Sequence, residues 1–308
     1  MPWNESDLPT LTGRRVIVTG ANSGLGFETA RALAQHGAEV TMAVRTRAKG
    51  DAAAEAIRAT GPTGSVEVAD LDLASLASIR DFADAWSSAN PDGLDLLINN
   101  AGVMAIPRRT TPDGFEMQLG TNHLGHYALT GHLLPALIAV PNSRVVTVSS
   151  QAHRMGRMDF EDLMGAQRYG KWKAYGQSKL ANLLFTAELQ RRLDRSGSSV
   201  KAMAAHPGFA ATDLVFDRYP VKRSIGERVM GWGTGTLAQS AQMGALPTLY
   251  AATAPGLAGD SYVGPDGWME QRGHPKVVDR APGAKERAAA ERLWSVSEEL
   301  TGVRYPFD

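Results

Sequence analysis

The sequence predicts a single α/β domain built on an open, doubly wound parallel sheet with helices on both faces. Short apolar runs alternate with helix-like stretches through much of the 308 residues. The runs are continuously apolar, as in strands that are covered on both faces. No linker or shift in composition divides the chain. We therefore expect one domain over residues 1–308.

The expected elements follow one another in a βα rhythm. Strands are recognised as short runs of β-branched and other apolar residues, and helices by apolar residues at helical spacing. The expected strands are 15–19, 39–44, 66–68, 94–98, 144–148 and 200–205. The expected helices are 24–36, 47–60, 75–88, 175–192, 237–252 and an amphipathic helix at 283–300. The looser segment 207–235 is expected to form a substrate-side lobe.

Composition and charge are those of an ordinary globular protein. Hydrophobic residues make up 43% of the chain and charged residues 21%. The 32 basic residues balance 32 acidic ones, so no net charge favours nucleic acid as a partner. The absence of cysteine excludes disulfides and thiolate chemistry. We see no export signal and no apolar run of about twenty residues, and expect a cytoplasmic protein without integral membrane association.

A glycine-rich turn lies between the first expected strand and the first expected helix. The stretch 19–26 reads TGANSGLG, with the spacing TGxxxGxG. Glycines at such a place let backbone N–H groups and a helix N-terminus approach a pyrophosphate. A tight turn alone can also require glycine, so the strand and helix on either side carry the argument. The residues expected to contact a dinucleotide here are Gly20, Asn22, Ser23, Gly24, Leu25 and Gly26.

The end of the second expected strand indicates which dinucleotide binds. An acidic side chain there would hold the ribose 2′-hydroxyl and repel a 2′-phosphate. Val44 occupies that place, and Arg45 follows it with Arg47 and Lys49 close by. A guanidinium can bind a phosphate through two hydrogen bonds. We therefore expect NADP(H), bound through Arg45, although solvated charges at the start of a helix would look the same.

Tyr175 and Lys179 are four residues apart and so lie on one face of a helix. A phenol with an unperturbed pKa of about 10 is a poor base at neutral pH. A nearby ammonium stabilises the phenolate and lowers that pKa. Tyr175 is therefore the expected general acid/base.

Together these motifs resemble the short-chain dehydrogenase/reductase family, which has a Rossmann-type fold. The resemblance extends to Asn99-Asn100-Ala101-Gly102, to Asn122 and to Ser149-Ser150. It implies that Ser150 and Tyr175 hydrogen-bond the substrate oxygen, that Lys179 binds the nicotinamide ribose, and that Asn122 helps to hold a water linked to the lysine. It implies further cofactor contacts at Asp72, Leu73, Asn99, Ala101, Gly102, Pro207, Gly208 and Thr212.

The segment between Ser150 and Tyr175 is longer than in most members of the family. The motifs Gln151-Ala152-His153 and Phe160-Glu161-Asp162-Leu163 in it, with Ser178-Lys179-Leu180-Ala181-Asn182 after it, resemble the retinol-dehydrogenase and WW-domain-oxidoreductase branch. This implies a small, lipophilic carbonyl or alcohol substrate. Pairing of family members through their tyrosine-bearing helices implies a homodimer or homotetramer.

Our leading expectation is hydride transfer between nicotinamide C4 and a carbonyl or alcohol carbon. Two alternatives stay open: a non-catalytic NADP-binding redox sensor, and a reductase of a conjugated C=C bond. Sensors typically lose the tyrosine or the lysine, and product analysis would reveal a C=C reductase. His123, His126 and His132 have helix-like spacing, but no carboxylate accompanies them closely, so we expect no metal site.

Overall fold

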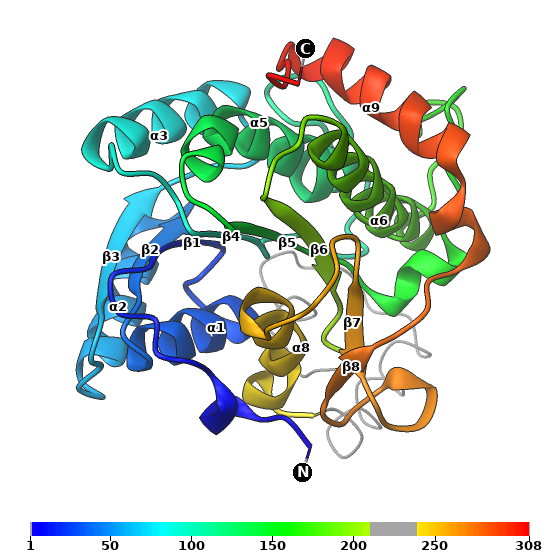
Figure 1. Cartoon of the computed structure of the whole chain (residues 1–308). Coiled ribbons are helices and arrows are strands. Elements are labelled where there is room, and N and C mark those ends of the chain that lie inside the picture. The colour runs from blue at the N-terminus through cyan, green and yellow to red at the C-terminus, as the bar shows by residue number, and fades with distance from the viewer. Residues whose placement is uncertain (1, 210–238, 308) are drawn as a thin grey trace.

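The strands form one open sheet. The computed structural model describes residues 2–209 and 239–307. Its strands are β1 (Arg15–Thr19), β2 (Glu39–Val44), β3 (Ser65–Asp70), β4 (Leu96–Asn99), β5 (Arg144–Val148), β6 (Lys201–Ala205), β7 (Tyr262–Pro265) and β8 (Pro275–Val277). Their order is β3-β2-β1-β4-β5-β6-β7-β8 (Figure 1). Every pairing is parallel except that of β7 with the edge strand β8.

Helices cover both faces of this sheet. One face carries α1 (Gly24–Gln35), α2 (Arg47–Arg58) and α8 (Ala241–Thr253), and the other carries α3 (Leu76–Ala89), α5 (Gly125–Ile138) and α6 (Lys171–Arg195) (Figure 1). The short α4 (Met117–Leu119) leads into α5, and α9 (Arg287–Thr301) packs outside α6. The predicted doubly wound α/β fold is confirmed.

The strand order reverses between β1 and β4, which are neighbours in the sheet. Ligands of open parallel sheets bind beyond the carboxyl ends of the strands at such a point. The chain leaving β1 is the glycine-rich turn, and the chain leaving β4 is Asn100-Ala101-Gly102. The fold thus places two of the expected cofactor motifs side by side.

The C-terminal segment completes the core on the α5 and α6 side. Trp294 of α9 is 3% exposed and lies among aromatic rings of α5, α6 and the C-terminal tail. Gly131 of α5 has no side chain because a Cβ there would lie 2.6 Å from Cγ1 of Val303. The outer surface of α6 is therefore covered by the chain itself.

The sequence did not predict α5, β7 or β8. Residues of α5 are buried on nearly all sides, so the helix lacks the polar face that reveals a helical period. β7 has four residues including a glycine and a proline, and β8 has three and begins at Pro275. Strands this short, interrupted by glycine or proline, carry no clear alternating pattern. Residues 210–235 of the expected lobe lie outside the described residues.

Candidate active site

The glycine-rich turn is closely packed against the chain that leaves β4. A Cβ on Gly26 would lie 2.3 Å from the Gly20 carbonyl oxygen and 2.6 Å from Nδ2 of Asn100. Gly20 has φ +66°, a left-handed conformation that favours glycine. Ser23 precedes α1 without capping it through its side chain. The first N–H groups of α1 can therefore meet an anion, which fits the pyrophosphate of a dinucleotide.

A buried network joins this turn to Asn122. The Thr19 hydroxyl accepts hydrogen bonds from the backbone N–H of Asn100 (2.9 Å) and Ala101 (3.0 Å). Oγ1 of Thr19 lies 3.0 Å from Nε2 of His126 and 3.3 Å from the Ile98 carbonyl oxygen, so the hydroxyl donates its proton to the histidine. Nδ1 of His126 then donates to the Asn122 carbonyl (3.1 Å). Burial lowers the pKa of His126 to about 4, so the ring is neutral at pH 7.

Asn122 is fully buried in the π-helical turn Gly120–Leu124. Its side chain accepts from the Val103 N–H (2.8 Å) and donates to the Val103 carbonyl and the Ser178 hydroxyl (both 2.9 Å). A Cβ on Gly102 would lie 3.0 Å from Oδ1 of Asn122 and 3.6 Å from Nζ of Lys179. Asn122 thus fixes the backbone after β4, and Gly102 leaves space beside the lysine.

Helix α6 brings Tyr175 and Lys179 beside Ser150, which follows β5. Ser150 accepts a hydrogen bond from the Ala152 N–H (3.1 Å), and its side chain is hydrogen-bonded to Tyr175. Tyr175 and Lys179 are 7% and 4% exposed, and Nζ of Lys179 lies 5.8 Å from the centroid of the Tyr175 ring. The predicted tetrad residues Asn122, Ser150, Tyr175 and Lys179 thus lie around one place.

Burial sets the protonation of the tyrosine and the lysine. It raises the pKa of Tyr175 to about 12, against the effect of the Ser150 hydrogen bond. It lowers the pKa of Lys179 to about 8. The tyrosine shift is opposite to the lowering expected from a nearby ammonium. Nζ of Lys179 donates to the Val148 carbonyl instead (3.0 Å).

The basic residues after β2 differ in their partners. Arg47 lies 3.2 Å from the Asp51 carboxylate and 3.7 Å from that of Asp70, which ends β3. Arg45 is exposed, and no carboxylate within residues 2–209 and 239–307 forms an ion pair with it. Of these two arginines, Arg45 is therefore the one whose guanidinium can meet a phosphate.

The remaining predicted cofactor residues are placed unevenly. Asp72 accepts a hydrogen bond from the Ala74 N–H (3.0 Å), and Leu73 is buried. Asn99 directs its amide to the Thr130 hydroxyl (2.9 Å) in α5, so its side chain points away from the turn. Gly208 has φ +66°, and a Cβ there would lie 2.4 Å from the Gln271 carbonyl oxygen. Thr212 lies outside the described residues.

Other kinds of site were sought in the described part of the chain. Residues 2–209 and 239–307 contain no group of three or more His, Asp or Glu side chains that could hold a metal ion. Over the same ranges, no helix has the length and apolar character needed to cross a bilayer. From the sequence we expect no metal at His126 and give it no role in the site. The bridge that His126 makes from Thr19 to Asn122 is missed there, because that bridge depends on tertiary contacts.

The sequence is similar to known enzymes over most of its length. Residues 14–220 match the short chain dehydrogenase family. Human retinol dehydrogenase 13 is 43% identical over 298 residues, covering 96% of this chain and 87% of that protein. Human retinol dehydrogenase 12 is 42% identical over 295 residues, covering 96% and 88%.

A solved structure shares the fold as well. A crystal structure of an uncharacterised protein from Mycobacterium paratuberculosis has a TM-score of 0.82 and 47% identity, covering 99% of this chain and 100% of that one. This chain is an oxidoreductase that transfers hydride with a nicotinamide cofactor and acts on a small molecule. By family match and by identity to these relatives, the chain belongs to the short chain dehydrogenase family, in the branch that contains the retinol dehydrogenases.

Proposed function

We propose that the protein is an NADP(H)-dependent oxidoreductase that interconverts a carbonyl and an alcohol on a small lipophilic substrate. One observation carries the proposal: two hydrogen-bonded hydroxyls, those of Ser150 and Tyr175, lie beside a buried lysine at the carboxyl ends of the strands. Two hydroxyl donors can hold a carbonyl oxygen while a proton is delivered to it. The names of the relatives support a lipophilic alcohol or carbonyl as substrate.

The protonation states suit reduction near neutral pH. Tyr175, with a pKa raised to about 12, holds its proton and can donate it to the substrate oxygen. Lys179, with a pKa of about 8, is mostly charged at pH 7 and stabilises the phenolate that remains. Ser150 donates a second hydrogen bond to the same oxygen. A nicotinamide cofactor bound at this site supplies the hydride from its C4.

Turnover of Tyr175→Phe tests this assignment. Loss of the general acid should lower kcat by about 100-fold or more, while NADPH still binds. Tyr250→Phe is the matched control, because Tyr250 packs edge-on against Trp3 in another part of the protein. A Tyr175→Phe variant as active as wild type would contradict the mechanism. NADPH binding without turnover on a panel of carbonyls would favour the sensor, and a saturated product from an enone would favour C=C reduction.

NADP(H) preference is proposed from Arg45, which is exposed beyond β2 next to Val44. A hydrogen bond to a charged group contributes about 1.5–3 kcal/mol. Calorimetric titration should therefore show NADPH binding at least about tenfold weaker in Arg45→Asp, and NADH binding unchanged or tighter. Arg80→Asp, an exposed change on α3, serves as control. Tighter binding of NADH than NADPH by the wild type would refute the Arg45 assignment.

Two further expectations remain proposals. We propose a cytoplasmic location, tested by fractionating cells that produce the tagged protein. We also propose a homodimer or homotetramer, tested by sedimentation. Because α9 covers the outer side of α6, with Trp294 stacked on Phe185, such an assembly would use another surface or displace α9.

A further inference from the structure

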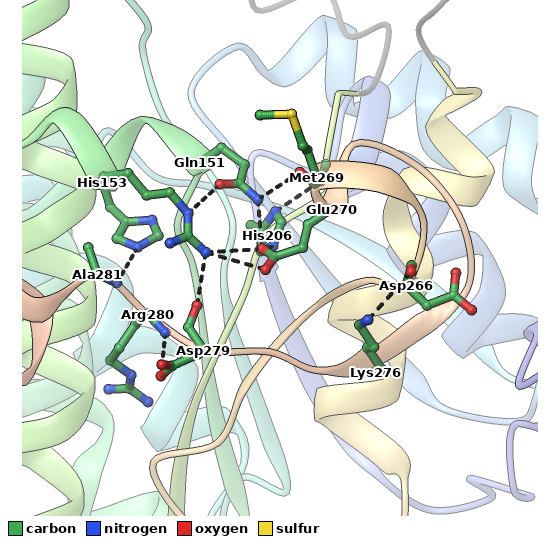
Figure 2. Close-up of polar contacts among 12 residues, drawn as sticks. Gln151, His153, His206, Asp266, Met269, Glu270, Lys276, Asp279, Arg280 and Ala281 are labelled. Atoms are coloured by element: carbon green, nitrogen blue, oxygen red, sulfur yellow. Dashed lines mark hydrogen bonds and ion pairs between the residues drawn. The ribbon is translucent and has the colours of Figure 1, made fainter.

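The Glu270 carboxylate contacts two loops, through Gln151 in the segment that follows Ser150 and through His206, which follows β6 (Figure 2). Glu270 ends the short helical turn Trp268–Glu270, which follows β7. Met269 and Glu270 are consecutive non-glycine residues in the left-handed region, with φ of 50° and 55°. Such a conformation persists only where the surroundings hold it. The contacts of the Glu270 side chain show what holds this turn.

The first loop follows Ser150. Nε2 of Gln151 donates to the Glu270 carboxylate at 2.7 Å, and the Arg154 guanidinium lies 3.3 Å from its other oxygen. Nε of Arg154 also donates to Oε1 of Gln151 (2.8 Å), which closes a triangle of three side chains. Both partners belong to the helical turn Gln151–Met155, which Ser150 caps. Glu270 therefore holds the segment that begins directly after the Ser150 hydroxyl.

The second loop follows β6. Nδ1 of the buried His206 accepts a hydrogen bond from the Gly208 N–H (3.2 Å), so the ring proton sits on Nε2. Nε2 faces the Glu270 carboxylate at 3.1 Å and donates to it. The hydrogen bond from His206 holds the pKa of Glu270 below its usual value. The carboxylate thus fixes the ring that positions the Gly208 amide, next to Pro207.

A second histidine fixes Ser150 from the backbone side. Nε2 of His153 accepts from the Ala281 N–H (3.1 Å), so Nδ1 carries the proton and donates to the Ser150 carbonyl (2.7 Å). His153 lies in the turn that Gln151 and Arg154 tie to Glu270. The Ser150 backbone and the Gly208 amide are therefore both connected to the chain that follows β7.

We propose that Glu270 is a positioning residue that fixes the distance between Ser150, which holds the substrate oxygen, and the Pro207-Gly208 turn beside the nicotinamide. The inference rests on the proposed function for the role of Ser150, and on the cofactor contact that the family resemblance implies for Pro207 and Gly208. Four contacts support it: those to Gln151, Arg154 and His206, and the Gly208 amide behind the histidine. Misplacement of a reacting group by about 1 Å can cost roughly 100-fold in rate.

Glu270→Gln is the first variant. The Glu270 carboxylate accepts hydrogen bonds from Gln151, Arg154 and His206, whereas a glutamine there would turn an NH₂ group toward at least one of these donors. We expect kcat to fall by about 10- to 100-fold while the Kd for NADPH stays close to that of the wild type. Glu55→Gln is the matched control: it makes the same chemical change in an exposed carboxylate that pairs with Arg58 on α2, away from the triangle. The exchange Gln151→Glu with Glu270→Gln restores a carboxylate next to an amide and to Arg154, and kcat should recover.

Hydrogen exchange gives a readout that does not depend on turnover. Glu270→Gln should speed hydrogen exchange of the backbone amides in segments 150–156 and 206–209. The double variant Gln151→Glu with Glu270→Gln should return the rates to those of the wild type. If Glu270→Gln does not fold, Gln151→Ala removes the 2.7 Å contact from the other side and should speed exchange in segment 150–156. Unchanged exchange in these segments would overturn the bridge.

Each failure has its own signature. If Glu270→Gln speeds hydrogen exchange but leaves kcat unchanged, the positioning role is overturned. The same holds if kcat falls in Glu270→Gln and the double variant does not recover it. A wild-type protein without turnover would refute the proposed function, while exchange would still decide whether Glu270 joins the two loops.

Discussion

Replacing Lys179 with methionine should stabilise the protein at neutral pH while abolishing turnover. Lys179 is 4% exposed, and burial lowers its pKa from 10.5 to about 8. Between these values the unfolded chain binds the proton and the folded protein does not. The free energy of unfolding therefore rises as pH increases from about 8 to 10.5. This gain in stability is lost again as pH falls through the folded-state pKa of Lys179.

The magnitude follows from the shift. A difference of 10.5 − 8 = 2.5 units at 1.36 kcal/mol per unit is on the order of 3 kcal/mol. Methionine also removes the hydrogen bond from Nζ to the Val148 carbonyl, worth about 1 kcal/mol. At pH 7 the Lys179→Met variant should therefore be more stable than wild type by roughly 2 kcal/mol.

Urea denaturation at pH 7, 8, 9 and 10 measures this difference. Comparing the two proteins at each pH cancels most other titrating groups, including Tyr175, whose raised pKa lowers stability only above pH 10. The advantage of the variant should shrink steadily above pH 8 and reverse by pH 10. Parallel stability profiles for the two proteins would refute the reasoning, because they would mean that folding does not change the pKa of Lys179.

Two other substitutions test the cofactor turn and the C-terminal packing. Gly26→Ala should weaken NADPH binding at least about tenfold and destabilise the fold by about 1–3 kcal/mol, because its Cβ would lie 2.3 Å from the Gly20 carbonyl. Gly283→Ala, with open space at its Cβ, should change neither quantity, and equal effects of both would contradict the packing argument. Trp294→Ala should lower the free energy of unfolding by about 3–5 kcal/mol in chemical denaturation, since the indole lies 4.6 Å from the Tyr305 ring and under the Arg192 guanidinium. A loss below about 1 kcal/mol would show that α9 contributes little to the core.

Much of the sheet could be predicted because its strands are apolar on both faces. The expected ranges 15–19, 39–44 and 144–148 agree with β1, β2 and β5 residue for residue. Helix α6 begins at Lys171, before the expected 175, since residues 171–174 have no buried side chain and so show no apolar period. Helix α5 could not be found by amphipathic pattern because it has almost no polar face.

The site was predictable where one motif carries the chemistry and not where distant segments meet. Tyr175 and Lys179 share a helix, so their spacing alone puts them together. The contact of Glu270 with Gln151 joins residues 119 positions apart, and no local pattern indicates it. Protonation also depends on the fold: the sequence suggested a lowered tyrosine pKa, whereas burial of Tyr175 raises it.

The two hydrogen bonds accepted by the Val148 carbonyl bear on how freely the Lys179 side chain can move. The carbonyl accepts hydrogen bonds from both Nζ of Lys179 and Nδ2 of Asn182, each at 3.0 Å. An acceptor with two donors stays satisfied when one of them leaves, so the ammonium can turn toward a ribose hydroxyl without stranding a buried oxygen. If Lys179 turns toward the cofactor ribose, as the family resemblance implies, Asn182 keeps the Val148 carbonyl hydrogen-bonded each time the lysine leaves it, and the end of β5 stays in place.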